Sequence, residues 1–519
     1  MKLNLKLIIG AVLSFLTVTN VQAGKDPRPN ILLITVDDMN WNSVGVYGQE
    51  LDNITPNIDK LAAEGKRFQY AYVQSPNCSP SRGVIQTGKY PHSSGMRGFY
   101  YVDYKDMTLQ SVLSDHGYFT AVLNKATDTS LSPKMENAWD FKGKFKKDGK
   151  RNPLNYSSTF EEILKASDNS GKPFYCVVNI ADPHKLFYND PGTKKEGYVD
   201  PTPSKLYKNS EVTIPDFLPN HPKIKQEVTN YYNSVKRADD CMGAVMSVLE
   251  EKGKKENTIV IFLSDHGMAL PFAKSSCYEN GVRTPFIVSW PGNIKANSVV
   301  KDQLVSAVDV MPTLLEILGI DEPDYLQGRS FKTILDGKKD KGRSEYVFTE
   351  FNENAGGIAR PIRGVLSSKY NYVFNPWSTG EIEFVSAAMY HTSYKVMANI
   401  LSKNDPAVKE RVNYLKYRRV EEFYDLEKDP DALHNLIDDP QYQEEINKMR
   451  NALEGWMKET GDYTLFAFQN RNNNDALKSF MKEEEAQAKQ RATTLKWKRY
   501  KNSEGPTKKR TKLYTISSK

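Results

Sequence analysis

Five short runs of apolar and β-branched residues, each bounded by turn-forming residues, restrict the fold of this chain most strongly. They are residues 30–36 (NILLITV), 120–123 (TAVL), 174–180 (FYCVVNI), 258–263 (TIVIFL) and 286–290 (FIVSW). Strands that are apolar along their whole length are typical of a largely parallel sheet with both faces covered. Helix-like segments separate the runs, so the sequence predicts an α/β fold with a large, mostly parallel sheet between layers of helices.

Two of the intervening helices have clear sequence signals. Thr55 is a plausible N-cap, Pro56 fits the first helical position, and Gly65 is expected to stop that helix. A long amphipathic helix is expected to run from residue 226 and to end at Gly253.

The 519 residues suffice for a large main domain and a smaller one. After about residue 345 the apolar runs become shorter, which predicts a smaller α+β subdomain. We therefore expect a signal peptide over 1–23, a catalytic domain over 24–345, a C-terminal subdomain over 346–460 and a basic, partly helical tail over 461–519.

The N-terminus has the pattern of a secretory signal peptide: Lys2 and Lys6, an apolar run, and small residues ending at Ala23. The apolar run is short for a membrane span, and no cysteine follows it to carry a lipid. The expected location is periplasmic or secreted, with no transmembrane segment and no nucleic-acid partner.

The basic character of the chain is concentrated in the tail. The formal charge is +7, and residues 471–519 hold 14 Lys and Arg against 5 Asp and Glu. A solvated, partly helical extension is the simpler interpretation, and a docking arm for an acidic polymer or surface is the alternative.

Polar side chains follow the apolar runs where parallel strands place binding sites, at their carboxyl ends. Asp37 and Asp38 follow the first run, and Asp265 and His266 follow the fourth. Carboxylates gathered from two strand ends suit Ca²⁺ or Mg²⁺, although imidazole is a less usual ligand for these ions. The alternative is that these residues cap loops or pair with Arg and Lys.

Cys78 lies in a turn that opens a helix, whereas cysteines usually occupy a core or a disulfide. The four cysteines are too scattered for a disulfide framework. Arg82 follows by one helical turn, and the helix N-terminus favours an anion beside Cys78. Lys125 and Lys274 could add positive charge, although a surface lysine is the simpler interpretation of each alone. His184 could act as an acid or base, and a histidine that only hydrogen-bonds within its loop is the equal alternative. Together, these residues predict a pocket that binds a tetrahedral oxyanion.

The stretch CSPSRGVIQTG resembles the signature of the formylglycine-dependent (type I) sulfatases of the alkaline phosphatase superfamily. NILLITVDDMNWNSVGVYG, IFLSDHG, CYENGVRTPFIVSWPG and EEFYDLEKDPDALHNL resemble further motifs of the family. CSPSR, ADPHK and PDFLPN are most similar to its heparan N-sulfatase (sulfamidase) branch.

The resemblance implies that Cys78 is oxidised to formylglycine by a formylglycine-generating or sulfatase-maturating enzyme. It implies one Ca²⁺ per chain, held by Asp37, Asp38, Asp265, His266 and the modified Cys78. Arg82, Lys125 and Lys274 would neutralise the sulfonyl oxygens, and His184 would protonate the leaving group. The implied reaction is hydrolysis of sulfate esters, with N-sulfate as an option, in a sulfated sugar or polysaccharide fragment.

Two positions depart from the family pattern. Gly-Lys-x-His is expected where this chain has Asn124-Lys125-Ala126-Thr127, so Thr127 replaces the histidine that would assist the formylglycine hydrate. His92 could take over that role, although a structural loop histidine is the simpler interpretation. His266 stands where many relatives have asparagine.

Two other functions compete with a sulfatase. One is a phosphonate or phosphodiester hydrolase of the same superfamily, which would share the metal site. The other is a catalytically impaired pseudo-sulfatase that binds sulfated glycans, which the loss of histidine at Thr127 suggests.

Overall fold

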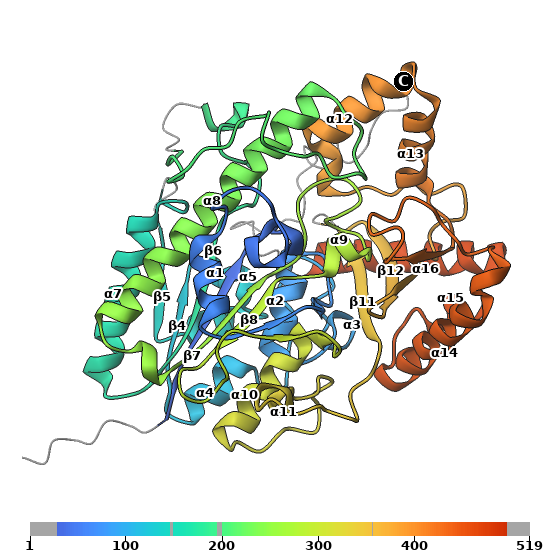
Figure 1. Cartoon of the computed structure of the whole chain (residues 1–519). Coiled ribbons are helices and arrows are strands. Elements are labelled where there is room, and N and C mark those ends of the chain that lie inside the picture. The colour runs from blue at the N-terminus through green and yellow to red at the C-terminus, as the bar shows by residue number, and fades with distance from the viewer. Residues whose placement is uncertain (1–27, 146–148, 195–199, 355–356, 496–519) are drawn as a thin grey trace, which may run out of the picture.

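The computed structural model describes residues 28–145, 149–194, 200–354 and 357–495 (Figure 1). The predicted signal peptide therefore lies outside the described residues. Within these ranges, the structure contains no helix that combines the length and the apolar character needed to cross a membrane.

An eight-stranded sheet in the order β5-β4-β6-β1-β7-β8-β2-β9 forms the centre of the molecule. Its strands are β1 (Asn30–Val36), β2 (Lys66–Phe68), β4 (Phe119–Leu123), β5 (Phe141–Gly143), β6 (Phe174–Ile180), β7 (Thr258–Ser264), β8 (Phe286–Ser289) and β9 (Ser298–Val300). Strand β1 is parallel to β6 and β7, and β4 is parallel to β5 and β6, while β8 runs antiparallel to β7 and β2. The predicted α/β fold with a mostly parallel sheet is confirmed, and all five apolar runs form strands.

Helices cover both faces of this sheet. The helices in this part of the chain are α1 (Pro56–Ala63), α2 (Cys78–Thr87), α3 (Pro91–Ser94), α4 (Leu109–Asp115), α5 (Ala126–Thr129), α6 (Pro133–Asn137), α7 (Pro153–Ser170), α8 (Pro222–Glu251), α9 (Glu279–Val282), α10 (Val310–Leu318) and α11 (Lys332–Leu335). Successive residues of β1 belong to different cores: Leu32 packs in the core that includes α7 and α8, and Leu33 in the core that includes α4 and α10. This division explains why the strand is apolar throughout.

The two helices with clear sequence signals form close to their predicted bounds. Helix α1 begins at Pro56 and ends at Ala63, two residues before Gly65, where a Cβ would lie 2.5 Å from the carbonyl oxygen of Val288. Helix α8 begins four residues before its predicted start, at Pro222, because the His221 side chain accepts a hydrogen bond from the backbone N–H of Lys223.

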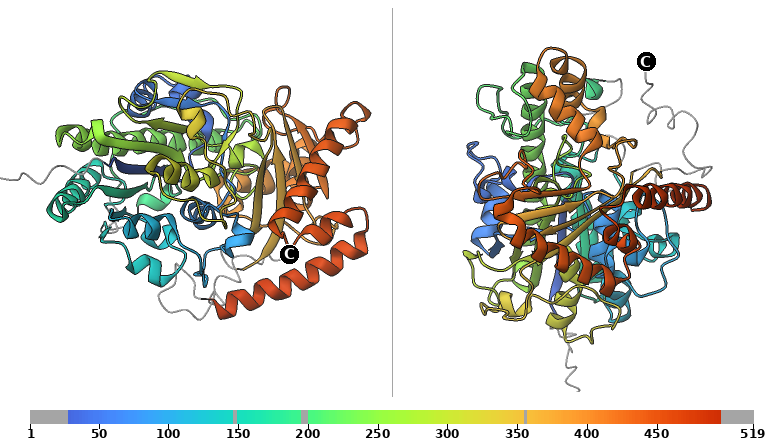
Figure 2. Two further views of the ribbon diagram at one scale, coloured as in Figure 1. Left: turned by 90° about the horizontal axis from the view of Figure 1, so that it is seen from below. Right: turned by 90° about the vertical axis from the view of Figure 1, so that its right-hand side faces the viewer.

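A second, antiparallel sheet stands beside the main sheet (Figure 2). It contains β11 (Val347–Glu353), β12 (Ala359–Leu366), β13 (Tyr370–Phe374) and β14 (Glu421–Asp425) in that order, and α12 (Thr392–Asn399), α13 (Pro406–Tyr417), α14 (Gln443–Thr460) and α15 (Leu465–Gln469) belong to the same part of the chain. A short parallel pair, β3 (Ala71–Tyr72) and β10 (Val305–Ser306), completes the strands.

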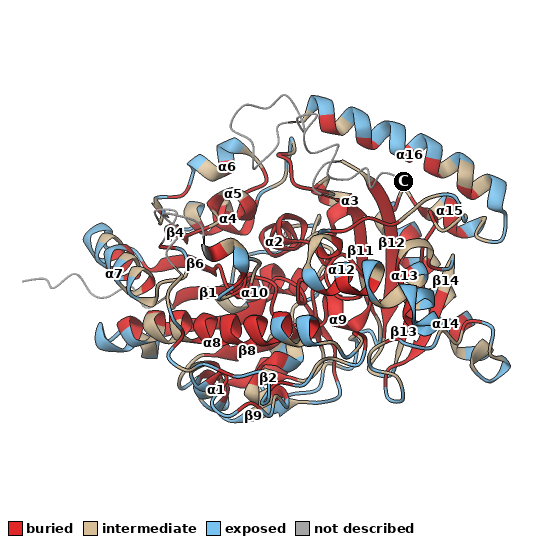
Figure 3. Cartoon of the chain, turned by 90° about the horizontal axis from the view of Figure 1, so that it is seen from above, coloured by how far each residue is buried: buried red, intermediate tan, exposed pale blue. Residues whose placement is uncertain are grey.

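Part of the basic tail forms helix α16 (Asn474–Thr494), which packs against β12 and α15. Its inner face buries Leu477, Met481 and Ala488, and its outer face is exposed (Figure 3). The interpretation of the whole tail as a solvated extension is therefore wrong for this helix, because apolar side chains recur on one face of it. Residues 496–519 of the tail lie outside the described residues.

Candidate functional site

The register of two parallel strands brings the predicted metal ligands together. Val36, the last residue of β1, is opposite Ser264, the last residue of β7. The residues that follow each strand, Asp37-Asp38 and Asp265-His266, therefore emerge side by side at one edge of the sheet.

A tight turn directs two successive carboxylates to the same place. Successive side chains of a strand point to opposite faces, but Asp38 adopts the left-handed conformation, with φ of 71°. The Asp38 backbone N–H donates to Asp265 Oδ1 at 3.0 Å, which ties this turn to the end of β7.

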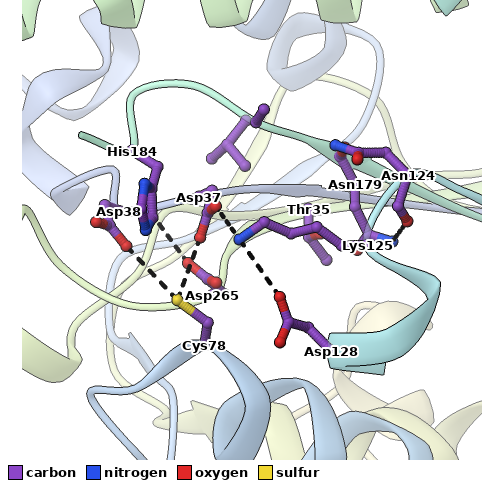
Figure 4. A network of polar contacts seen from close by, with 12 residues as sticks. Thr35, Asp37, Asp38, Cys78, Asn124, Lys125, Asp128, Asn179, His184 and Asp265 are labelled. Carbon is purple, nitrogen blue, oxygen red and sulfur yellow. Dashed lines mark hydrogen bonds and ion pairs between the residues drawn. The ribbon is translucent and has the colours of Figure 1, made fainter. Parts of the chain in front are cut away.

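Cys78 is the first residue of α2 and lies fully buried among these ligands (Figure 4). Its Sγ lies 3.5 Å from Asp37 Oδ1, 3.3 Å from His266 Nε2 and 3.7 Å from Lys274 Nζ. The structure thus brings Cys78 to the predicted metal centre, with the N-terminus of α2 behind it.

The donor set fits a hard divalent cation. One ligand atom each from Asp37, Cys78, Asp265 and His266 lie within 4.8 Å of one another, and Asp38 belongs to an overlapping group of the same kind. The backbone carbonyl of Gly267 can only accept, so His266 Nδ1 donates to it at 2.9 Å and the Nε2 lone pair remains for a ligand role. Three buried carboxylates suit Ca²⁺, with the imidazole as its less usual partner.

Three cationic side chains balance the three carboxylates. Arg82 contacts Asp265 at 2.8 Å, Lys274 contacts Asp38 at 2.7 Å, and Lys125 forms an ion pair with Asp37. Burial alone would raise the pKa of Asp37 and Asp38, but the neighbouring positive charges hold the pKa of Asp37 well below its usual value and lower that of Asp38 to about 2. Both carboxylates are therefore ionised and available to a cation.

The Cys78 thiol itself is not activated. Burial raises its pKa far above the usual value, and this effect outweighs the nearby Lys274 ammonium. A thiolate nucleophile is therefore disfavoured at this position.

The turn that carries Lys125 also departs from ordinary backbone geometry. Asn124 and Lys125 both have positive φ, 61° and 48°. Asn tolerates this conformation better than most residues, which explains how it stands where the family pattern has Gly. Asn179 supports the turn, because its side-chain amide donates to the Asn124 carbonyl oxygen at 2.8 Å.

Thr127 does not substitute chemically for the expected histidine. Its hydroxyl donates to Glu136 Oε1 at 3.2 Å. The next residue, Asp128, accepts a hydrogen bond from the Ser79 hydroxyl at 2.7 Å and lies 4.0 Å from the Lys125 ammonium. We did not identify Asp128 from the sequence, because one acidic residue in a short helix gives no signal.

Two polar side chains inside the strands hold Arg82 and were also missed. Its guanidinium donates to Thr35 Oγ1 at 2.5 Å and to Asn179 Oδ1. A polar residue near the end of an otherwise apolar run is the signal that could have identified both.

His184 lies at the same edge of the sheet, after β6. Its Nδ1 donates to the Lys185 carbonyl oxygen at 2.5 Å, so Nε2 carries the lone pair of the neutral ring. Burial lowers the His184 pKa to about 4. Asp182 anchors the loop, because its carboxylate accepts from Arg151 at 2.7 Å and Arg237 at 2.6 Å.

The other histidine considered for the hydrate lies elsewhere. His92 Nδ1 contacts Glu350 Oε2 at 2.8 Å, and its ring packs edge-on against Trp456. These partners belong to the C-terminal subdomain, so the contacts support a structural loop histidine.

A hollow of about 680 Å³ reaches the site from one side. Its lining includes Asp37, Lys125, Thr127, Glu136, Arg151 and His184. A ligand bound there could place an anionic group against Lys125 and His184.

Comparison of the sequence with known proteins identifies the family of this chain. The model of the sulfatase family matches residues 29–320, and that of the C-terminal region of N-sulphoglucosamine sulphohydrolase matches 265–385. An ulvan-active sulfatase of Formosa agariphila is 29% identical over 482 residues, covering 84% of this chain and 76% of the relative. Human N-sulphoglucosamine sulphohydrolase is 27% identical over 474 residues, covering 84% and 91%.

Solved structures agree on the fold. The structure of a 2-O GAG sulfatase superposes with a TM-score of 0.62 at 22% identity, covering 84% of this chain and 93% of the other. With a family model matching more than half of its length, this chain belongs to the sulfatase family and is a sulfatase-type hydrolase of the alkaline phosphatase superfamily.

Proposed function

We propose that this chain is an exported sulfatase that hydrolyses sulfate groups of a sulfated sugar or polysaccharide fragment, with formylglycine made from Cys78 and one bound Ca²⁺. The observation that carries the proposal is the position of Cys78, which lies fully buried at the start of α2 between the carboxylates of Asp37 and Asp38 and the ammonium of Lys274.

The buried, protonated thiol supports a modified residue rather than a thiolate nucleophile at position 78. The hydrate of the formylglycine aldehyde, formed by addition of one water molecule, would supply a hydroxyl nucleophile, and Ca²⁺ would supply positive charge that favours ionisation of that hydroxyl. Asp37, Asp38, Asp265 and His266 would hold the cation together with residue 78.

The charge balance supports an anionic substrate. Three carboxylates and three cationic side chains offset one another in the described site, so a bound divalent cation leaves it with net positive charge. Arg82, Lys125 and Lys274 are fixed by their carboxylate partners before substrate binds, and such prearranged charges stabilise the developing charge on sulfonyl oxygens.

His184 is the proposed proton donor to the leaving group. Its Nδ1–H is held by the Lys185 carbonyl, so Nε2 is the atom that takes up and returns a proton. Its lowered pKa leaves the ring neutral in the free site, whereas a sulfate beside it favours the charged imidazole. Binding of the sulfated substrate would therefore favour the protonated form of His184, which is the form that can donate a proton to the leaving group.

Sequence similarity supports a glycan as the carrier of the sulfate. The relatives include an ulvan-active sulfatase and N-sulphoglucosamine sulphohydrolase, and the C-terminal model belongs to the latter. N-sulfated glucosamine is therefore a substrate to test beside O-sulfated sugars. The N-terminal pattern supports a periplasmic or secreted enzyme.

A pseudo-sulfatase that binds sulfated glycans is the second candidate. The observation that favours it is Thr127, which donates to Glu136 and supplies no imidazole to the hydrate.

Replacing the modified residue separates these two candidates. Cys78→Ala should lower turnover of an aryl sulfate by about 10⁶-fold, the scale seen when a nucleophile is removed. Cys176→Ala, which removes a buried thiol from β6, is the matched control and should retain turnover. Equal turnover of wild type and Cys78→Ala would contradict the formylglycine assignment, and no turnover by wild type would favour the pseudo-sulfatase.

The role of His184 predicts a dependence on the leaving group. General acid catalysis contributes about 10²- to 10⁴-fold, and the need for it grows with the basicity of the leaving group. His184→Ala should therefore slow hydrolysis of a sugar sulfate by at least about 100-fold but affect an activated aryl sulfate much less. An equal loss on both substrates would argue against an acid role.

Cation removal tests the donor set. A chelator should abolish turnover and lower the melting temperature, and added Ca²⁺ should restore both. The melting temperature should respond because a ligand at about 100 times its Kd stabilises the folded state by about 2.7 kcal/mol. Asp265→Asn should weaken the Ca²⁺-dependent shift of the melting temperature. A melting temperature and turnover that are insensitive to chelator would contradict the cation site.

A further inference from the structure

The last turn of helix α16 reaches the residue that the proposed mechanism makes reactive. Cys78, Phe99 and Ala492 form an apolar cluster of their own, apart from the three larger cores, and they are 0%, 5% and 7% exposed. The Cys78 side chain therefore meets two environments: the polar group of Asp37, His266 and Lys274, and the apolar surface of Phe99 and Ala492.

Charged contacts hold the end of α16 in this position. Arg491 donates to Glu353 Oε1 at 2.7 Å and to Glu484 Oε1 at 2.5 Å. Glu353 is fully buried at the end of β11, and the Tyr100 hydroxyl donates to the same Oε1 at 3.2 Å. A buried carboxylate shared by Arg491 and Tyr100 fixes α16 to the segment that carries Phe99.

The same segment of β11 is tied to the residue before Cys78. The Asn77 side-chain amide donates to the Glu353 backbone carbonyl at 3.2 Å, and Asn77 occupies the N-cap position of α2. One residue, Glu353, thus links the end of α16 to the start of the helix that presents Cys78.

Close backbone packing keeps Ala492 near the site. Gly357 has a positive φ of 75°, and a Cβ added there would lie 2.7 Å from the Ala492 Cβ. Ala488, one turn earlier, is fully buried. The helix therefore approaches the C-terminal sheet with small residues, and a larger side chain at 492 has no open space on the sheet side.

We propose that Phe99 and Ala492 form an apolar wall of the catalytic pocket, and that α16 positions the reacting residue 78 through this wall. The inference rests on the proposed function. An apolar wall excludes water from one side of residue 78 and strengthens its electrostatic interactions with Lys274 and the carboxylates. It also confines the sugar to the open side, the hollow lined by Lys125, Thr127 and His184.

Enlarging the wall residue tests the proposal. Ala492→Phe should lower kcat/KM for a sulfated sugar and for an aryl sulfate by about 10- to 100-fold, because small displacements of reacting groups have effects of this size. Ala486→Phe makes the same substitution on the exposed face of α16 and should leave both rates unchanged. Rates are to be expressed per formylglycine-containing molecule, and melting temperatures identify any unfolded variant. Ala492→Val serves as a milder change if Ala492→Phe does not fold.

A second measurement does not depend on sulfatase activity. In protein that retains the thiol, Phe99→Ala should raise the rate at which iodoacetamide alkylates Cys78, relative to buried Cys176, whereas Ala486→Gly should not. The proposed wall would be contradicted if folded Ala492 variants hydrolysed both sulfates at the wild-type rate and if Phe99→Ala left the alkylation rate of Cys78 unchanged. Inactive wild-type protein with increased alkylation in Phe99→Ala would instead contradict only the proposed function.

Discussion

Three carboxyl groups buried at the ends of two neighbouring strands are the constraint on which the rest of this structure depends. Asp37, Asp38 and Asp265 are completely buried, and burying uncompensated charge is strongly unfavourable. Arg82, Lys125 and Lys274, each from a different segment, supply the compensation. The charge pattern at the edge of the sheet therefore requires α2, the turn after β4 and the loop after β7 to converge on one point.

The meeting of these segments at one point also determines where Cys78 lies. Helix α2 places Cys78 among the carboxylates and Arg82, one turn later, in contact with Asp265. Polar partners within the strands, Thr35 and Asn179, then fix the guanidinium. The site is therefore a network of ion pairs and hydrogen bonds in which each side chain is held in position by its partners.

The strands and most of the polar cluster could be predicted from sequence because both depend on local patterns. Apolar runs identify buried parallel strands, and the carboxyl ends of such strands meet at one edge, so Asp37 and Asp265 were predictable neighbours. Asp128 and the Phe99–Ala492 contact were not predictable, since they depend on tertiary packing between segments far apart in sequence. The tail was misjudged for the same reason: its charge is visible in composition, whereas the burial of Leu477 and Met481 depends on the C-terminal sheet.

The central claim of this account is that residue 78 works as formylglycine. Mass spectrometry of the peptide that spans Cys78, from protein made in a host with the maturation enzyme, tests it directly. The account predicts a mass lower by about 18 Da than that of the cysteine peptide, as oxidation of the thiol side chain to an aldehyde requires. An unmodified cysteine in a host that modifies other sulfatases would contradict it.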